Sequence, residues 1–269
     1  MQIDAMFEQA VAAVQESDSG VITIPKAWSQ GRTVYGGMSA SLLYVAMQSK
    51  LRSPKHMRSL NVNFIGPLLV EKPSTLEVEV LREGKNVTQV MAKLTQDGKT
   101  AVMAQAVFAL DRESKILVDN KEPHNLPAPT KGKFIPPIPG IVPKFIAHLD
   151  LDLVEGGMPF SGSKTSDTKG WIRFKKAPEK IEDGHLIALI DGFPCTVLQT
   201  LRWPAPASTM NWNIEFLHPH APIKPTDWLA YTSTPRQAAD GYCHMESDIW
   251  DASGRLIAIS RQVVAVFDK

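Results

Sequence analysis

The stretch SLNVNFIGP, residues 59–67, returns in altered form as NWNIEFLHP at residues 211–219. Asn61 matches Asn213, and the two stretches lie 152 residues apart in the chain. Each stretch alternates polar and apolar residues, which is typical of a strand with one buried face. The pair is therefore the first sign that the chain repeats one strand-rich unit.

Two more segments recur in the same order as this pair. DGKTAVMAQAVFAL at 97–110 parallels SGRLIAISRQVVAV at 253–266, at an offset of 156 residues. Upstream, YGGMSASLLYVAM at 35–47 takes the place of IDGFPCTVLQTL at 190–201. Three segments in one order at nearly one spacing predict an internal duplication.

The same order of elements is expected in each half. A strand comes first (residues 21–24 and 171–175), and a glycine-bearing turn then opens a helix, at Gly36 in the first half and at Asp191 in the second. Several antiparallel strands follow, as in the alternating TLEVEVLREG of residues 75–84. This pattern predicts the α+β class, with one long helix wrapped by an antiparallel sheet in each half.

A proline-dense segment divides the chain, because proline lacks the donor that helices and central strands require. It contains PHNLPAPTKGKFIPPIPGIVP, residues 123–143. We expect an N-terminal half at 1–117, a linker at 118–143 and a C-terminal half at 144–269.

Composition and charge exclude several classes of function. The chain has 269 residues, 43% apolar and 21% charged, with a net charge of +1 and scattered basic residues. This balance gives no electrostatic case for nucleic acid or an anionic membrane surface. No apolar run approaches the ~18 residues of a membrane span. Cys195 and Cys243 are expected to be buried free thiols.

The N-terminal segment has acidic residues and no apolar core of a signal peptide, and its spacing predicts a short amphipathic helix. The chain is therefore expected to be cytoplasmic. The two halves are expected to dock like a dimer, and further association of whole chains into a homo-oligomer stays open.

The ordered segments resemble acyl-CoA thioesterase II, the TesB-like double-hotdog thioesterases. The likeness covers nearly the whole chain and is carried by YGGMSASLLYVA, by 59–87, by STMNWNIEFLHP and by WDASGRLIAISRQ. It implies a double hotdog fold and hydrolysis of fatty-acyl-CoA to free acid and CoA. It also implies no metal, no cofactor and no covalent serine intermediate.

That family uses an Asp, a Thr or Ser, and a Gln to hold and activate water. The resemblance places the Gln at Gln262 and the Asp position at Asn211, which is a departure because an amide is no general base near neutral pH. The hydroxyl falls on Thr234, with Thr232 nearly as good. Without the resemblance, Gln262 and Asn211 would be interpreted as polar residues on solvated strand faces.

Asp191 is the replacement carboxylate, because it stands where the second helix is expected to begin. There it would either cap the helix or hold the attacking water. Gly36 and Gly37 open the first helix, where free N–H groups can stabilise an oxyanion. Tight packing between strand and helix is the other explanation for these glycines.

Other chemistries lack their motifs. The chain has no G-x-S-x-G elbow, G-x-G-x-x-G turn or phosphate-binding P-loop. His218 and His220 have no acidic or cysteine partner at ligand spacing, so they are interpreted as loop histidines. The main rival is a non-catalytic protein that binds acyl-CoA or lipid, which Asn211 favours. A hotdog hydratase is disfavoured, because no histidine lies near Asp191.

Overall fold

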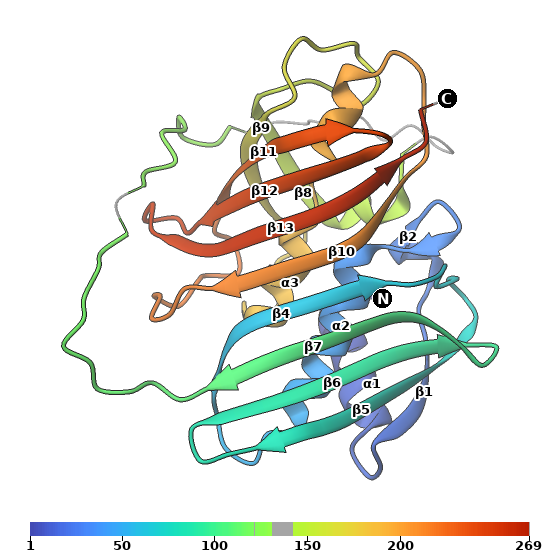
Figure 1. Cartoon of the computed structure of the whole chain (residues 1–269), viewed down its shortest axis with the longest axis vertical. Helices are drawn as coiled ribbons and strands as arrows, with labels where there is room; N and C mark the ends of the chain where they lie inside the picture. Colours follow the sequence, from blue (N-terminus) through green and yellow to red (C-terminus); the bar gives the residue numbers. More distant parts are fainter. Residues whose placement is uncertain (121, 131–141, 269) are drawn as a thin grey trace.

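The computed structural model describes residues 1–120, 122–130 and 142–268, and a broad antiparallel sheet dominates it (Figure 1). The helical elements are α1 (Ile3–Ala13), η1 (Lys26–Trp28), α2 (Gly36–Ser49), η2 (Lys144–His148), α3 (Asp183–Ile190) and η3 (Thr196–Thr200). The strands are β1 (Ser19–Thr23), β2 (Ser29–Gln30), β3 (Thr33–Val34), β4 (His56–Phe64), β5 (Pro73–Glu83), β6 (Val87–Gln96), β7 (Lys99–Ala109), β8 (Leu149–Glu155), β9 (Thr168–Phe174), β10 (Ala207–Phe216), β11 (Leu229–Ala239), β12 (Tyr242–Trp250) and β13 (Leu256–Val266).

The large sheet has the same strand order in both halves of the chain. The first half runs β1-β5-β6-β7-β4, and the second runs β9-β11-β12-β13-β10 with β8 added outside β9. The two halves join where β4 pairs with β10, side by side at the centre of the sheet (Figure 1). The repeated order is what an internal duplication predicts, and the α+β prediction is confirmed.

The repeated stretches at 59–67 and 211–219 lie at this joint between β4 and β10. Asn61 and Asn213 face each other across β4 and β10, and their amide groups are hydrogen-bonded at 3.0 Å. Val62 and Trp212, the next pair, are buried on the opposite face. The alternation therefore gives each strand one face in the core and one face that links the halves through polar side chains.

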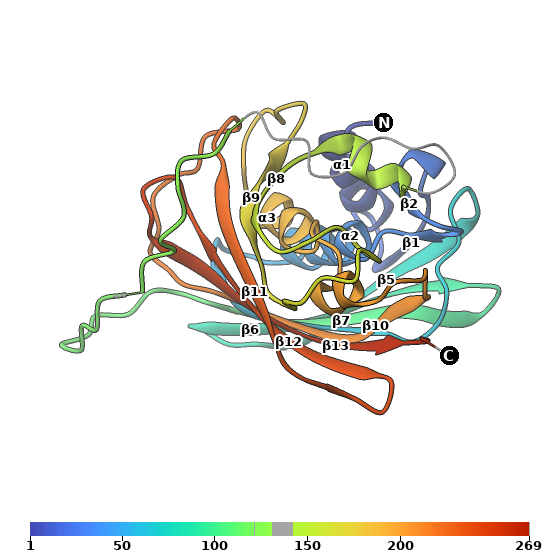
Figure 2. The same ribbon diagram turned by 90° about the horizontal axis from the view of Figure 1, so that it is seen from above.

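The helices lie on the concave side of the sheet (Figure 2). Nearly every residue of α2 is buried, from Gly37 to Met47, which is typical of a helix enclosed on all sides. It packs against α3 and α1. Tyr35, just before α2, donates a hydrogen bond of 2.7 Å to the carbonyl of Ala188 in α3, so the two helices are also tied together by a polar contact.

The second helix is not where the sequence predicted it. Helix α3 ends at Ile190 and Asp191 is its C-cap, whereas the helix was expected to begin at Asp191. The start is set by a capping box between Glu182 and His185. After Asp191, a side chain at Gly192 would meet Ile172 at 2.3 Å, so glycine allows the chain to turn away close to β9. The segment at 190–201, which the repeat matched to the first helix, instead follows α3 and holds only the short η3, so this part of the predicted correspondence is wrong.

Several smaller expectations can be compared with the structure. The N-terminal helix is present as α1. Cys243 is buried and Cys195 partly buried in one apolar cluster, and both are free thiols, as predicted. Among the described residues, no helix combines the length and apolar character that crossing a membrane requires.

The boundaries 1–117, 118–143 and 144–269 stay our proposal for the division of the chain. Strand β7 ends at Ala109 and η2 begins at Lys144, and the described residues between them hold no helix or strand. Residues 121 and 131–141 of the proposed linker lie outside the described residues.

Candidate active site

Asp191 lies where the C-terminus of α3, from the second half, meets the N-terminus of α2, from the first half. Its Oδ2 accepts a hydrogen bond of 2.7 Å from the backbone N–H of Gly37, in the first turn of α2. Its Oδ1 accepts one of 3.0 Å from the side-chain amide of Gln262 on β13. The carboxylate is thus held at the positive end of the α2 dipole, by groups that come from both halves.

Gln262 points toward the helices, not toward solvent. It is the cross-strand partner of Trp212, and both neighbours on its face, Ser260 and Val264, are buried. Its amide nitrogen binds Asp191 and its amide oxygen accepts a hydrogen bond of 3.1 Å from the hydroxyl of Thr209. The chain Thr209–Gln262–Asp191 therefore fixes which end of the amide faces the carboxylate.

Sequence reasoning missed Thr209, because strict alternation puts it on the same face as Asn211 and Asn213. The register of β10 shifts between Thr209 and Asn211, where a β-bulge adds Met210 as an extra residue. The bulge turns Thr209 to the helix side, opposite Val264. No local sequence pattern marks this bulge. The bulge belongs to the repeated unit, because β4 has the same irregularity between Met57 and Ser59.

Burial raises the pKa of Asp191 to about 6, although the hydrogen bonds from Gln262 and Gly37 favour its charged form. Such a carboxylate is mostly ionised at neutral pH and is still a far better proton acceptor than an exposed aspartate. A base with a pKa near the working pH is what general acid–base chemistry needs.

Gly36 and Gly37 leave room where a side chain would intrude. A Cβ at Gly36 would lie 2.8 Å from Oδ2 of Asp191 and 3.3 Å from the ring of Phe64. A Cβ at Gly37 would lie 2.7 Å from the ring of Tyr35. The N–H of Gly37 already binds Asp191, so this amide is not the free oxyanion donor that the sequence suggested. The N–H groups of Gly36 and Met38 are the remaining candidates in this turn.

Asn211 and Thr234 are not brought to this group. The amide of Asn211 donates to Asn63 Oδ1 at 3.1 Å and to the carbonyl of Val62 at 3.4 Å, on the outer face of the sheet. Thr234 is exposed on β11. Thr232 shares its face, which alternates with the buried Tyr231 and Ser233. The hydroxyl in contact with Gln262 is that of Thr209, and the carboxylate in contact with it is that of Asp191.

Two buried tyrosines, Tyr35 and Tyr231, lie near enough to Asp191 to interact with it electrostatically, and each stacks on a phenylalanine. Tyr35 stacks on Phe145 with ring centroids 3.8 Å apart, and Phe193 stacks on Tyr231 at 4.8 Å. The Tyr231 hydroxyl is hydrogen-bonded to Ser247 at 3.0 Å, and burial raises the pKa of Tyr231 to about 12. Both tyrosines are uncharged near neutral pH, so neither brings a second charge close to Asp191.

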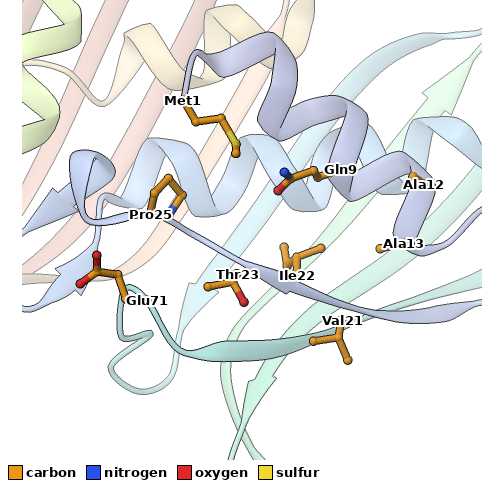
Figure 3. A pocket seen from close by; sticks show the side chains of 9 residues that line it. All are labelled: Met1, Gln9, Ala12, Ala13, Val21, Ile22, Thr23, Pro25 and Glu71. Atoms are coloured by element: carbon orange, nitrogen blue, oxygen red, sulfur yellow. The ribbon is translucent and has the colours of Figure 1, made fainter.

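An open hollow of about 660 Å³ lies elsewhere, between α1 and β1 (Figure 3). Met1, Gln9 and Glu71 are among its lining residues, and none of the predicted site residues is. This hollow is therefore separate from the polar group around Asp191. The described residues also hold one cluster with the donor types of a metal site, at the other end of α3.

A helix wrapped by an antiparallel sheet, twice in one chain, with a carboxylate, an amide and a hydroxyl in contact, defines the class of double-hotdog thioesterases. The acyl-CoA thioesterase N-terminal domain matches residues 24–109, and the acyl-CoA thioesterase C-terminal domain matches residues 119–266. The chain therefore belongs to the acyl-CoA thioesterase family, in its TesB-like form, as the resemblance implied.

Solved structures share this fold over almost the whole chain. A conserved protein with the hot dog fold from Alicyclobacillus acidocaldarius is 23% identical, covers 97% of each chain and has a TM-score of 0.83. The acyl-CoA thioesterase II TesB2 of Mycobacterium marinum is 16% identical, with 98% of this chain and 97% of that chain covered and a TM-score of 0.72. The tesB protein of Mycobacterium avium subs paratuberculosis is 14% identical, with 97% and 99% covered and a TM-score of 0.71. At these identities the likeness establishes the fold. No curated protein matches the chain in a sequence search.

Proposed function

We propose that the protein hydrolyses an acyl-CoA thioester to free acid and CoA by direct attack of water. The observation that carries this proposal is the carboxylate of Asp191, held between the N-terminus of α2 and the Gln262–Thr209 pair. Family membership supports a thioesterase in general. The raised pKa of Asp191 supports its role as the base in particular.

In the proposed reaction, Asp191 and Thr209 hold a water molecule against the thioester carbonyl carbon. The water oxygen forms the new bond to this carbon while one of its protons passes to Asp191. Gln262 keeps the carboxylate in place through its amide nitrogen. The carbonyl oxygen, now an oxyanion, accepts hydrogen bonds from the first-turn N–H groups of α2, which Gly36 leaves accessible.

The intermediate then collapses and the carbon–sulfur bond breaks. CoA leaves with the bonding electrons and takes the proton from Asp191, which restores the carboxylate. A thiol is a far stronger acid than water or an alcohol, so the thiolate of CoA is a good leaving group and no stronger acid is needed. The acyl chain would lie along apolar side chains between helix and sheet, and the CoA phosphates would stay at the mouth of the site.

The rival proposal, a protein that binds acyl-CoA without hydrolysing it, rested on Asn211 at the position of the base. Asn211 lies on the opposite face of β10 from Thr209 and binds Asn63 of the other half. It therefore gives no reason to expect an inactive site. Binding without turnover stays an outcome of the experiment.

The test measures release of free CoA thiol from short, medium, long and aromatic acyl-CoAs. We expect Asp191→Asn and Gln262→Ala each to lower kcat/KM by about 100-fold or more, since general acid–base help is worth roughly that much. Asp240→Asn, in the exposed turn between β11 and β12, and Gln105→Ala, on the exposed face of β7, are the matched controls. Turnover that survives Asp191→Asn would rule out this base. Binding of acyl-CoA with no turnover in the native protein would rule out the hydrolase.

A further inference from the structure

A second group of polar side chains lies at the opposite end of α3 from Asp191. Asp183 is the first residue of α3, and His218 and His220 follow β10. One ligand atom of each of these three residues lies within 4.8 Å of the others. Eight residues of helix separate Asp183 from Asp191, which is about 12 Å, so this group is not part of the proposed reaction.

The two imidazole rings present unused nitrogen atoms. Nε2 of His218 and Nε2 of His220 are buried and have no hydrogen-bond partner among the described residues. Nδ1 of His220 lies 3.1 Å from the carbonyl of Ala221, which can only accept, so Nδ1 carries the proton and Nε2 the lone pair. A ring nitrogen with a free lone pair can bind a metal ion.

Asp183 faces these rings without a cation. Among the described residues, its side chain accepts one hydrogen bond, of 3.3 Å from the hydroxyl of Tyr44 in α2, and forms no salt bridge. A carboxylate in such a place is costly to keep charged unless it is paired or binds a metal. A partly buried carboxylate and two buried imidazole nitrogens that have no partner among the described residues form an incomplete set of contacts.

We propose that Asp183, His218 and His220 bind one divalent transition-metal ion, with Zn²⁺ the best match to two imidazoles and one carboxylate. Ligand atoms at about 2.1 Å from a tetrahedral Zn²⁺ lie about 3.4 Å from one another, so the present cluster needs to close by about 1.4 Å at most. Three protein ligands leave the fourth position to water. The spacing along the chain does not reveal this site, because Asp183 belongs to α3 and both histidines follow β10, more than 30 residues later.

The metal would act on structure. It would tie the loop after β10 to the start of α3, while Tyr44 links the same carboxylate to α2. Because Asp191 caps the other end of α3, the ion would hold the helix that positions the proposed base without touching the substrate. Metal removal should therefore lower the stability of the chain far more than its turnover rate.

The experiment uses the full chain, stripped with a chelator and then titrated with Zn²⁺ in a calorimeter. We expect one Zn²⁺ per chain and an unfolding midpoint that rises by about 5 °C or more at 100 times Kd. Co²⁺ in place of Zn²⁺ should give the visible absorption of a four-coordinate site. Failure of the native chain to bind Zn²⁺ more tightly than about 100 µM would overturn the proposal.

Variants separate this site from adventitious binding. His218→Ala with His220→Ala should weaken Zn²⁺ binding by about 100-fold or more, and Asp183→Asn by about tenfold or more. His244→Ala, at an exposed position on β12, should bind Zn²⁺ as tightly as the native chain does. If the double variant does not fold, Asp183→Asn still decides. Unchanged Zn²⁺ binding by Asp183→Asn would refute the site, whatever the thiol assay shows.

Discussion

The two copies of the repeated unit have the same strand order and the same bulge, but they carry different side chains at equivalent positions. In the second half, the bulge in β10 turns Thr209 toward Gln262, and Gln262 pairs across the strands with Trp212. In the first half, β4 has its bulge 152 residues earlier, and Met57 stands where Thr209 does. Ala106 pairs with Leu60 as Gln262 pairs with Trp212.

Both first-half residues are fully buried and apolar, as Met57 and Ala106 have 0% exposure. The first residues of the two helices differ as well. The N-terminus of α2 is Gly36 and Gly37, which leave room at Asp191, whereas α3 begins with Asp183 near two histidines. Duplication thus supplied two equivalent backbone frames. The second-half frame, on β10 and β13, carries the polar group of a candidate active site, and the equivalent positions of the first-half frame, on β4 and β7, have become core.

Removing Met57 tests the structural role of the first frame and has the largest expected effect. Met57→Ala should lower the free energy of unfolding by about 2–5 kcal/mol, because the side chain leaves a cavity in the core. The midpoint of urea unfolding measures this change. The folded variant should keep its kcat/KM for acyl-CoA. A folded Met57→Ala protein that loses activity tenfold would mean that both frames serve the reaction.

Much of this comparison could be predicted from the sequence. Strand alternation and the repeated segments predicted the general order of elements, because side-chain period and burial are local properties. They did not predict that β4 and β10 pair at Asn61 and Asn213. The repeat singled out Asp191 and the resemblance singled out Gln262, and the structure brings these two residues into contact. The resemblance added the chemistry that these two residues were expected to serve.

The rest depends on contacts that no local pattern carries. Thr209 was missed because one extra residue in β10 reverses the face of everything before it. The boundary of α3 was misplaced because Asp191-Gly192 looks like a helix start, while Glu182 and His185 in fact provide the cap. Asp183 was not connected to His218, since only the folded chain brings the helix and the loop together.

The pH dependence of turnover sharpens the comparison on the catalytic side. Since Asp191 must be ionised to accept a proton, and burial raises its pKa to about 6, kcat/KM should fall as pH drops through about 6. The fall should approach tenfold per pH unit below that value, with a plateau above it. The thiol-release assay at constant ionic strength measures the profile. A plateau that extends down to pH 4 would show that an ordinary aspartate, or another group, is the base.

The smallest expected effect separates the hydroxyl that the structure selects from the one that the resemblance selected. Thr209 binds the oxygen of the Gln262 amide and thereby keeps its nitrogen toward Asp191, so Thr209→Ala should lower kcat/KM by about tenfold. Thr209→Ser keeps the hydroxyl and should recover most of the activity. Thr234→Ala removes an exposed hydroxyl from β11 and should change kcat/KM less than twofold. If Thr234→Ala lowered kcat/KM more than Thr209→Ala did, the hydroxyl that binds water would be the one on β11. The bulge in β10 would then be, like its copy in β4, a feature of the backbone with no part in the chemistry.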